Sequence, residues 1–592
     1  MDLQQTWLLP ALIATPIIAG LLCWLVEKKN PHLPRWIALI GMLITLVMSL
    51  ILYIKVDMQA LNATALAQVG DQSALPWMAT FELPWIPSFG ISFALAMDGL
   101  SLLMIGLTAL LGVMAVGCSW KEIGHRVGFF HLNLLWSLGG VIGVFLAIDL
   151  FLFFFFWEMM LVPIYFLIAL WGHDVKDKLG NVIKSKSTAA TKFFIYTQAS
   201  GLIMLIGIGM LVMINFAQTG KLSFYYADLL GTYMGSWEYV IMLCFFIGFA
   251  VKLPVFPLHG WLPDAHAQAP TAGSVDLAGI LIKTAAFGLL RFVLPLFPTA
   301  SAEFAPIAIT LGVIGIFYGA WLAFAQTDVK RLLAYTSVSH MGFVVLAIYA
   351  GTLVSLQGLM VQMIAHGLSS AALFIMAGQL YERLHTRDLT MMGGMWGQLR
   401  YFAPLLMFFC AALLGIPGTG NFIGEIVILL GAFAAYPIFT IVTAVSFVWA
   451  GLYALILIHQ ALFGKPKVDF ANDNHHDGET SQDNINQDNA NHTFTIKDLG
   501  RRELSLLTLL AVGLLYTGLY PKAVMETSEA AMRYIERSYQ HTVPPNMLGE
   551  MSATLNAQSQ TEVIEGVVIQ DDEFERMHLD FMNKTSGVVS FD

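Results

Sequence analysis

Residues 238–294 read EYVIMLCFFIGFAVKLPVFPLHGWLPDAHAQAPTAGSVDLAGILIKTAAFGLLRFVL, and this stretch decides the fold. Two long apolar segments in it each carry one lysine, Lys252 and Lys283, and Pro254 and Pro257 interrupt the first segment. A lysine in the middle of a membrane-spanning helix costs about 2.5–3.5 kcal/mol of insertion free energy, so its presence requires a reason. The prolines remove backbone donors and leave carbonyl groups free beside the lysine. The stretch therefore predicts a transport site for a small cation, most simply a proton.

The whole chain has the composition of a membrane protein. Of its 592 residues, 57% are hydrophobic and only 12% are charged, and the formal net charge is −10. A soluble protein of this length does not need so much apolar surface, so the lipid bilayer is the expected solvent. No basic patch alternates with aromatic residues, which excludes nucleic acid as a partner. The four cysteines lie in apolar segments without CxxC spacing, and this pattern predicts buried thiols rather than disulfides or cluster ligands.

Apolar windows of spanning length predict an all-α polytopic membrane protein with about fourteen transmembrane helices. A second interruption, GIPGTG at 415–420, falls within a helix that is too long for one span. Two broken helices in corresponding positions favour two inverted five-helix repeats. The predicted organisation is helices 1–3 in residues 1–126, a first five-helix repeat in 127–294, a second in 305–463, a disordered cytoplasmic loop in 464–503, helix 14 in 504–520 and a polar acidic tail in 521–592.

Loop charges predict the orientation of these helices. Every second loop is rich in lysine and arginine, whereas the alternate loops hold little beyond Lys55 and Lys221. Because basic loops stay in the cytoplasm, we expect a multi-pass protein of a bacterial inner (plasma) membrane. An even number of helices then places both termini on the periplasmic side.

Glu158 and Lys252 are the first candidates for chemistry inside the membrane. Glu158 lies in FLFFFFWEMMLVP, between aromatic side chains. It is either a structural carboxylate that pins helices together or a counter-ion that approaches and leaves Lys252, and so changes how tightly the lysine holds its proton. Lys283 lies near the middle of its own segment, too deep for its side chain to reach either interface easily.

Three further candidates follow along the chain. Glu425 comes after the second break; a phosphate-binding loop is excluded there because no strand precedes the glycines and no Lys-Ser/Thr pair follows them. His340 and His366 lie inside predicted helices, where each either hydrogen-bonds a neighbouring helix or passes a proton. Their position in the chain between Lys283 and Glu425 makes a proton relay a hypothesis.

Four motifs carry a resemblance to a known family: FFFFWEMMLVPIYFLIALWG at 153–172, AVKLPVFPLHGWLPDAHAQAPTAGSVDLAGILIKTAAFGLLRF at 250–292, FAQTDVKRLLAYTSVSHMGF at 324–343 and GIPGTGNFIGE at 415–425. They resemble the antiporter-like membrane subunits of respiratory complex I, the proton-translocating NADH:quinone oxidoreductase. The resemblance covers roughly residues 1–525 and is greatest with the M-type subunits. Glutamate at position 425, where sister subunits and Mrp-type antiporters generally have lysine, favours type M.

The resemblance implies roles for the candidate residues. Glu158 and Lys252 would form the family's glutamate–lysine pair, and Lys283 would be the central lysine. His340 and His366 would lie on the connecting polar axis, and Glu425 would be the terminal proton residue.

The resemblance also implies the setting of the chain. It would be a proton-translocating subunit that carries no redox chemistry, cofactor or metal of its own. NADH, flavin mononucleotide, iron–sulfur clusters and quinone would belong to partner subunits. Its neighbours would be other antiporter-like membrane subunits and lipid. The alternative is a subunit of an Mrp-type cation/proton antiporter.

The polar loop generates a first prediction. Residues 465–500 are rich in Asn, Asp, Gln and His and cannot support a packed core. His475, His476 and His492 lack regular ligand spacing, so a solvated linker is favoured over a metal site. Deleting residues 470–495 should leave assembly and NADH:quinone turnover nearly unchanged. Loss of most activity in an assembled complex would show that the loop docks on another surface.

Overall fold

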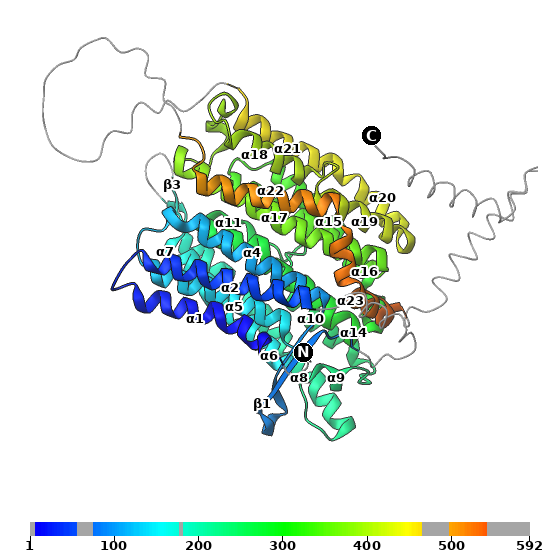
Figure 1. Ribbon diagram of the computed structural model, residues 1–592. Helices are drawn as coiled ribbons and strands as arrows, with labels where there is room; N and C mark the ends of the chain where they lie inside the picture. The colour runs from blue at the N-terminus through cyan, green and yellow to red at the C-terminus, as the bar shows by residue number, and fades with distance from the viewer. Residues whose placement is uncertain (1–5, 56–74, 177–181, 465–496, 541–592) are drawn as a thin grey trace, which may run out of the picture. The chain divides into compact units, whose positions relative to one another are not determined.

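The computed structural model describes residues 6–55, 75–176, 182–464 and 497–540. In Figure 1 the long helices of this part run side by side as one bundle. Among the described residues, twelve helices are long and apolar enough to cross a membrane by length and composition. The predicted polytopic helical fold is confirmed. The count of fourteen spans and the inverted repeats stay predictions.

The first half of the chain supplies the helices around Glu158 and Lys252. Its elements are α1 (Leu8–Val26), α2 (Leu33–Lys55), β1 (Ala79–Ile86), η1 (Pro87–Phe89), β2 (Ile91–Met97), α4 (Gly99–Glu122), α5 (Val127–Leu146), α6 (Leu150–Met159), α7 (Leu161–Trp171), β3 (Val175–Lys176), β4 (Val182–Lys184), α8 (Lys186–Thr219), α9 (Tyr226–Leu229), α10 (Trp237–Lys252) and α11 (Leu262–Gln268).

The second half begins with the interrupted helix that carries Lys283. Its elements are α12 (Thr271–Asp276), η2 (Leu277–Leu281), α13 (Ile282–Gly288), η3 (Leu289–Val293), α14 (Leu294–Leu296), α15 (Pro298–Phe324), α16 (Val329–Ala350), α17 (Leu353–Leu384), η4 (Leu389–Met391), η5 (Met395–Gly397), α18 (Phe402–Leu414), α19 (Gly420–Ala435), α20 (Pro437–Ala444), α21 (Ser446–Leu462), α22 (Arg501–Leu519) and α23 (Lys522–Gln540).

Both predicted helix breaks are present. Between α10 and α11 the chain leaves the helical path, and Val255 donates its amide to Ala250 instead of to the carbonyl one residue later. The indole of Trp261 satisfies that freed Val251 carbonyl at 2.8 Å. The second break separates α18 from α19, and Gly415 and Gly418 in it adopt positive φ angles that glycine tolerates best.

Two short sheets accompany the helices of the predicted all-α fold. Strands β1 and β2 form an antiparallel hairpin that ends one residue before Asp98, which caps α4 by accepting the Ser101 amide. The hairpin contains β-favouring Phe, Trp and Ile residues and a Gly90 turn with positive φ. A two-residue ladder, β3–β4, is the other described sheet.

The first part of the expected polar tail, which begins at residue 521, is helical. Residues 522–540 form α23, whose buried side chains include Met532 and Ile535. A Cβ on Gly99 at the start of α4 would lie 1.7 Å from the Thr527 carbonyl oxygen, so α23 packs closely beside the end of the hairpin. The predicted tail from 541 and the loop from 465 to 496 lie outside the described residues.

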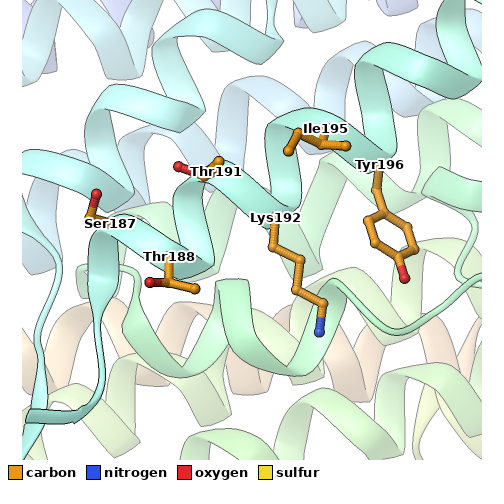
Figure 2. A pocket seen from close by; sticks show the side chains of 6 residues that line it. All are labelled: Ser187, Thr188, Thr191, Lys192, Ile195 and Tyr196. Carbon is orange, nitrogen blue, oxygen red and sulfur yellow. The ribbon is translucent and has the colours of Figure 1, made fainter.

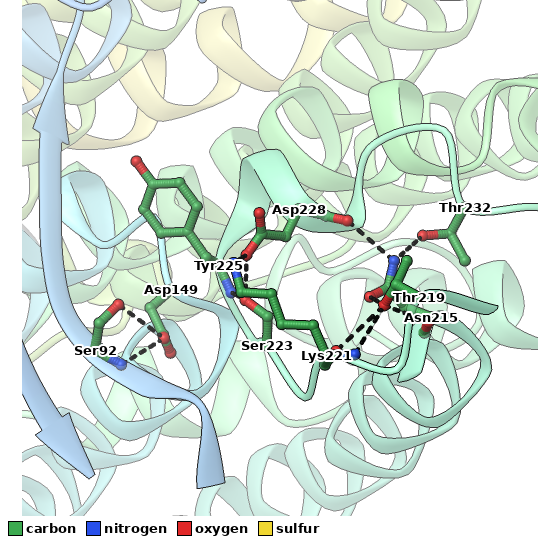
Figure 3. Close-up of polar contacts among 9 residues, drawn as sticks. All are labelled: Ser92, Asp149, Asn215, Thr219, Lys221, Ser223, Tyr225, Asp228 and Thr232. Carbon is green, nitrogen blue, oxygen red and sulfur yellow. Dashed lines mark hydrogen bonds and ion pairs between the residues drawn. The ribbon is translucent and has the colours of Figure 1, made fainter. Parts of the chain in front are cut away.

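Polar contacts tie the hairpin to the loops at the same end of the bundle (Figure 3). Asp149 accepts the Phe151 and Leu152 amides at the start of α6 and the Ser92 amide of β2. Nearby, Asp228 accepts from Lys221 Nζ at 2.8 Å and from Ser223 Oγ at 2.6 Å.

Those two donors outweigh the opposing effect of partial burial, and so the pKa of Asp228 lies below its ordinary value. Asn215 on α8 completes this end by donating to the Thr232 hydroxyl at 2.9 Å. The carboxylate and amide groups therefore fix the loop that joins α8 to α10.

The basic loops lie at the opposite end of the bundle. Arg35 donates to the Ile123 carbonyl, which joins the first turn of α2 to the loop after α4. Lys330 Nζ donates to the Ala269 carbonyl, and Arg383 pairs with Glu503 at 2.7 Å. Loops separated widely in sequence but alike in charge therefore meet at one end, as the alternating charge pattern requires.

A buried ion pair joins α4 to the interrupted helix. Arg291, in the π-helical turn η3, pairs with Asp98, and their side chains are 2% and 1% exposed. The guanidinium carbon also lies 4.8 Å from the centre of the Trp77 ring. The pair thereby fixes one end of the helix that carries Lys283.

A second prediction follows from this burial. Asp98→Asn should keep the cap of α4 but leave the Arg291 charge unpaired, which costs about 3–5 kcal/mol of stability. Asp98→Asn/Arg291→Met should be less damaging because no charge remains. The measurement is the yield and thermal stability of the assembled complex. If Asp98→Asn is as stable as the wild type, the Asp98–Arg291 ion pair does not have this structural role.

Candidate proton-translocation site

Lys252 is the last residue of α10 and lies directly at the first helix break. Its side chain is fully buried, and Nζ donates to the Trp157 carbonyl oxygen at 3.2 Å. Nζ also lies 3.6 Å from the centre of the Trp157 indole ring, a cation–π distance. One residue of α6 therefore supplies both contacts to this ammonium group.

Glu158 and Lys252 are neighbours but are not joined in this structure. Among the ion pairs of the described residues, none links the two side chains, and the glutamate–lysine pair implied by the resemblance stays a prediction. Glu158 points instead to α8, where its carboxyl group lies beside Gly201 and Gln198. The structure thus shows the two charges in separate positions, Lys252 against Trp157 and Glu158 against Gly201.

Lys283 lies behind a π-helical turn. In η2 the Ile282 amide bonds to the Leu277 carbonyl, five residues back, so it does not take the Ala278 carbonyl as an α-helix would. Lys283 Nζ donates to that Ala278 oxygen. The widened turn gives the fully buried lysine a backbone acceptor within its own helix.

Four predicted residues form one row inside the bundle. Lys283 Nζ lies 2.8 Å from Nδ1 of His366 on α17. The His366 ring lies 5.4 Å, centre to centre, from the ring of His340 on α16. His340 Nδ1 lies 2.7 Å from Oε1 of Glu425 on α19. All four residues are at most 2% exposed.

Close packing of α17 against α19 places Glu425 in this row. Gln362 of α17 donates to Glu425 Oε1 at 3.0 Å. A Cβ on Gly424 would lie 2.6 Å from the Gln362 side chain, and one on Gly358 would lie 2.6 Å from the Ile428 amide. These glycines let α17 and α19 approach closely enough for Gln362 to reach the carboxylate.

The sequence identified the six candidate residues, but it did not identify three residues of the interior: Trp157, Gln362 and Asp276. Trp157 gave no signal beyond its aromatic neighbours, and Gln362 was one polar residue in a long helix. Asp276 is fully buried and accepts from the Ser137 hydroxyl at 2.8 Å. A charged residue seven positions before Lys283, inside an apolar segment, was the signal that could have identified it.

A surface pocket of about 440 Å³ lies along α8, apart from these six residues (Figure 2). Lys192, which lines it, pairs with Asp264 at 2.7 Å, and Arg331 pairs with the other oxygen of Asp264 at 2.5 Å. The remaining lining residues are Ser187, Thr188, Thr191, Ile195 and Tyr196. The pocket is therefore a groove on one helix, and its only charge is already paired.

A helical membrane bundle with broken helices and a buried lysine–histidine–glutamate row defines the class of antiporter-like membrane subunits. A family model described as NADH:quinone oxidoreductase/Mrp antiporter matches residues 147–450. The chain belongs to this family.

Within it, the relatives of high identity are subunits M. The chain is 57% identical over 537 residues to NADH-quinone oxidoreductase subunit M of Escherichia coli (strain K12), covering 90% of this chain and 99% of that one. It is 56% identical over 531 residues to the subunit M of Pseudomonas aeruginosa, covering 90% and 97%.

Comparison with solved structures supports the same family. A chain of respiratory complex I from Thermus thermophilus superposes with a TM-score of 0.73 at 26% identity, covering 90% of this chain and 99% of that one. A chain of the Mrp complex from Dietzia gives 0.69 at 21% identity, with coverage of 91% and 100%, which shows the fold alone. The complex I relationship is therefore better supported than the Mrp alternative.

The contacts of Glu425 generate a third prediction. Glu425→Gln should lower proton translocation about 10-fold or more, because the amide keeps the shape but cannot exchange a proton with His340. Glu425→Lys should be tolerated better, since lysine also titrates. If Glu425 only packs the broken helix, the order reverses, because an unpaired buried ammonium is costly.

The measurement is NADH-driven proton uptake into sealed vesicles for both variants, normalised to the amount of assembled complex. Gln pumping like the wild type, together with an inactive Lys variant, would make Glu425 a structural residue.

Proposed function

We propose that this chain is the M-type proton-translocating subunit of complex I and moves protons along the row Lys283–His366–His340–Glu425. It is a membrane-arm subunit of NADH-quinone oxidoreductase and works beside other membrane subunits. One observation carries the proton route: the four side chains are buried together in an apolar bundle, and 2.8 Å and 2.7 Å contacts join the two ends of the row to its histidines.

The row has the chemistry of a proton relay. Lys283 can donate from Nζ to His366 Nδ1, and an imidazole that gains a proton on one nitrogen can release one from the other. His366 Nε2 has no hydrogen-bond partner among the described residues, so the ring is not held in one orientation by that nitrogen. Transfer from His366 to His340 must cross a ring-centre separation of 5.4 Å, and His340 then delivers the proton to Glu425, which its Nδ1 already contacts.

Lys252 and Glu158 act on this row through charge. A carboxylate that moves towards a buried lysine strengthens the hold of that lysine on its proton, and one that moves away weakens it. Because Lys252 is fully buried and Glu158 is half-buried among apolar helices, their mutual interaction is screened less than between exposed charges. Proton translocation against the membrane potential costs about 2.3 kcal/mol per 100 mV, which rearrangement of a few buried charges can supply.

The proposal assigns the redox chemistry to partner subunits. NADH, flavin mononucleotide, iron–sulfur clusters and quinone would be bound there, and electron transfer would drive proton movement here by electrostatic coupling. The membrane would be a bacterial inner membrane. Its cytoplasmic face would hold the basic loops, and both chain termini would lie on the periplasmic face with the β1–β2 hairpin and α23.

Lys252→Met is the test of this function and the fourth prediction. Methionine fills the buried volume without a charge, so the complex should assemble while NADH-driven proton uptake falls about 10-fold or more. Lys221→Met is the matched control, because this lysine is 69% exposed and lies outside the spans. Wild-type proton uptake by assembled Lys252→Met would overturn the proposed function.

A further inference from the structure

Glu158 rests against a place on α8 where a side chain is missing. A Cβ built on Gly201 would lie 2.0 Å from Glu158 Oε1 and 3.2 Å from the carboxyl carbon. Real Cβ atoms essentially never come within 3.0 Å of such an atom. The carboxyl group therefore occupies the space that any other residue at position 201 would fill.

A polar side chain borders this space on the same face of α8. Gln198 precedes Gly201 by three residues, which places both on one side of α8. The Gln198 side chain lies beside the Glu158 carboxyl group, and Oε1, the atom nearest Gly201, is buried and has no hydrogen-bond partner among the described residues. We call this feature, made by Gln198 and Gly201, the α8 notch.

Lys252 has a matching separate position. Its ammonium contacts the carbonyl and the ring of Trp157, the residue directly before Glu158. Two adjacent residues of α6 thus border both resting positions: the lysine lies on Trp157 and the carboxylate lies in the α8 notch. Each charge has contacts that do not depend on the other.

We propose that Gly201 is a positioning residue: because it lacks a side chain, the α8 notch holds the Glu158 carboxylate apart from Lys252 and sets how readily the two charges pair. This inference rests on the proposed function, since it concerns the pair that acts on the proton row. It assigns a role to α8, a helix that supplies none of the six candidate residues.

The fifth prediction is that Gly201→Ala expels the carboxylate from the notch. Restoring an ordinary contact requires a shift of at least 1 Å, and misplacement of this size can cost about 10- to 100-fold in rate. We expect NADH-driven proton uptake per assembled complex to fall about 10-fold or more. Gly209→Ala is the matched control, because Gly209 lies on the same helix with nothing within 4 Å of a Cβ.

A double-variant cycle separates positioning from helix packing. Glu158→Asp shortens the side chain by one methylene, about 1.5 Å, and gives the new methyl group room. Gly201→Ala/Glu158→Asp should therefore pump faster than the product of the two single effects, relative to the wild type. The proposal would be overturned if the proton uptake rate of the double variant equals the product of the two single effects. A wild-type uptake rate for Gly201→Ala would also overturn it.

Gln198→Leu decides the matter if Gly201→Ala fails to assemble or Glu158→Asp pumps below detection. It removes the polar side chain of the notch without adding bulk at position 201, and uptake should fall severalfold. Wild-type uptake by Gln198→Leu in that case would overturn the proposal. An inactive Lys252→Met together with unaffected notch variants would reject the role of Gly201 and leave the proposed function standing.

Discussion

Charged groups in an apolar bundle must find their partners within the protein, and the described structure is arranged around this constraint. Water does not solvate backbone or side-chain charges in a hydrocarbon interior, so each unpartnered group is costly. Lys252 contacts Trp157, Lys283 contacts a carbonyl of its own helix, and Glu425 accepts from two side chains. The charges persist inside the bundle because each has a specific place.

Departures from regular helix supply many of those places. The break after α10 lies at Lys252, the π-helical turn η2 lies before Lys283, and the break before α19 lies near Glu425. A regular helix uses its carbonyl groups internally and has none to offer a side chain. At Lys283 the irregular turn frees a carbonyl that the buried ammonium uses, whereas at Lys252 the acceptor is a carbonyl of α6.

Glycine supplies the remaining places by allowing close approach. At Gly424 the missing side chain brings Gln362 to Glu425, and at Gly201 it makes room for the Glu158 carboxyl group. In a membrane, small residues let helices pack tightly, and the same contact can expose a polar group of one helix to another. Packing and electrostatics therefore cannot be separated at these positions.

The sequence by itself determined the membrane class, both helix breaks and the six candidate residues, because each depends on local properties. Apolar run length sets the spans, proline and glycine set the breaks, and a charge inside a span is conspicuous wherever it occurs. The β1–β2 hairpin was missed because its short run of alternating residues is a weak signal beside the long apolar helices.

Only the tertiary structure decided which of these residues meet. His366 and Lys283 are 83 residues apart, and His340 and Glu425 are 85 apart, so their contacts depend on how α16, α17 and α19 pack around the interrupted helix. The separation of Glu158 from Lys252 likewise depends on Trp157 and on the α8 notch, which lie on different helices. Contacts between residues on different helices are set by how those helices pack. This packing cannot be inferred from the local properties of a sequence.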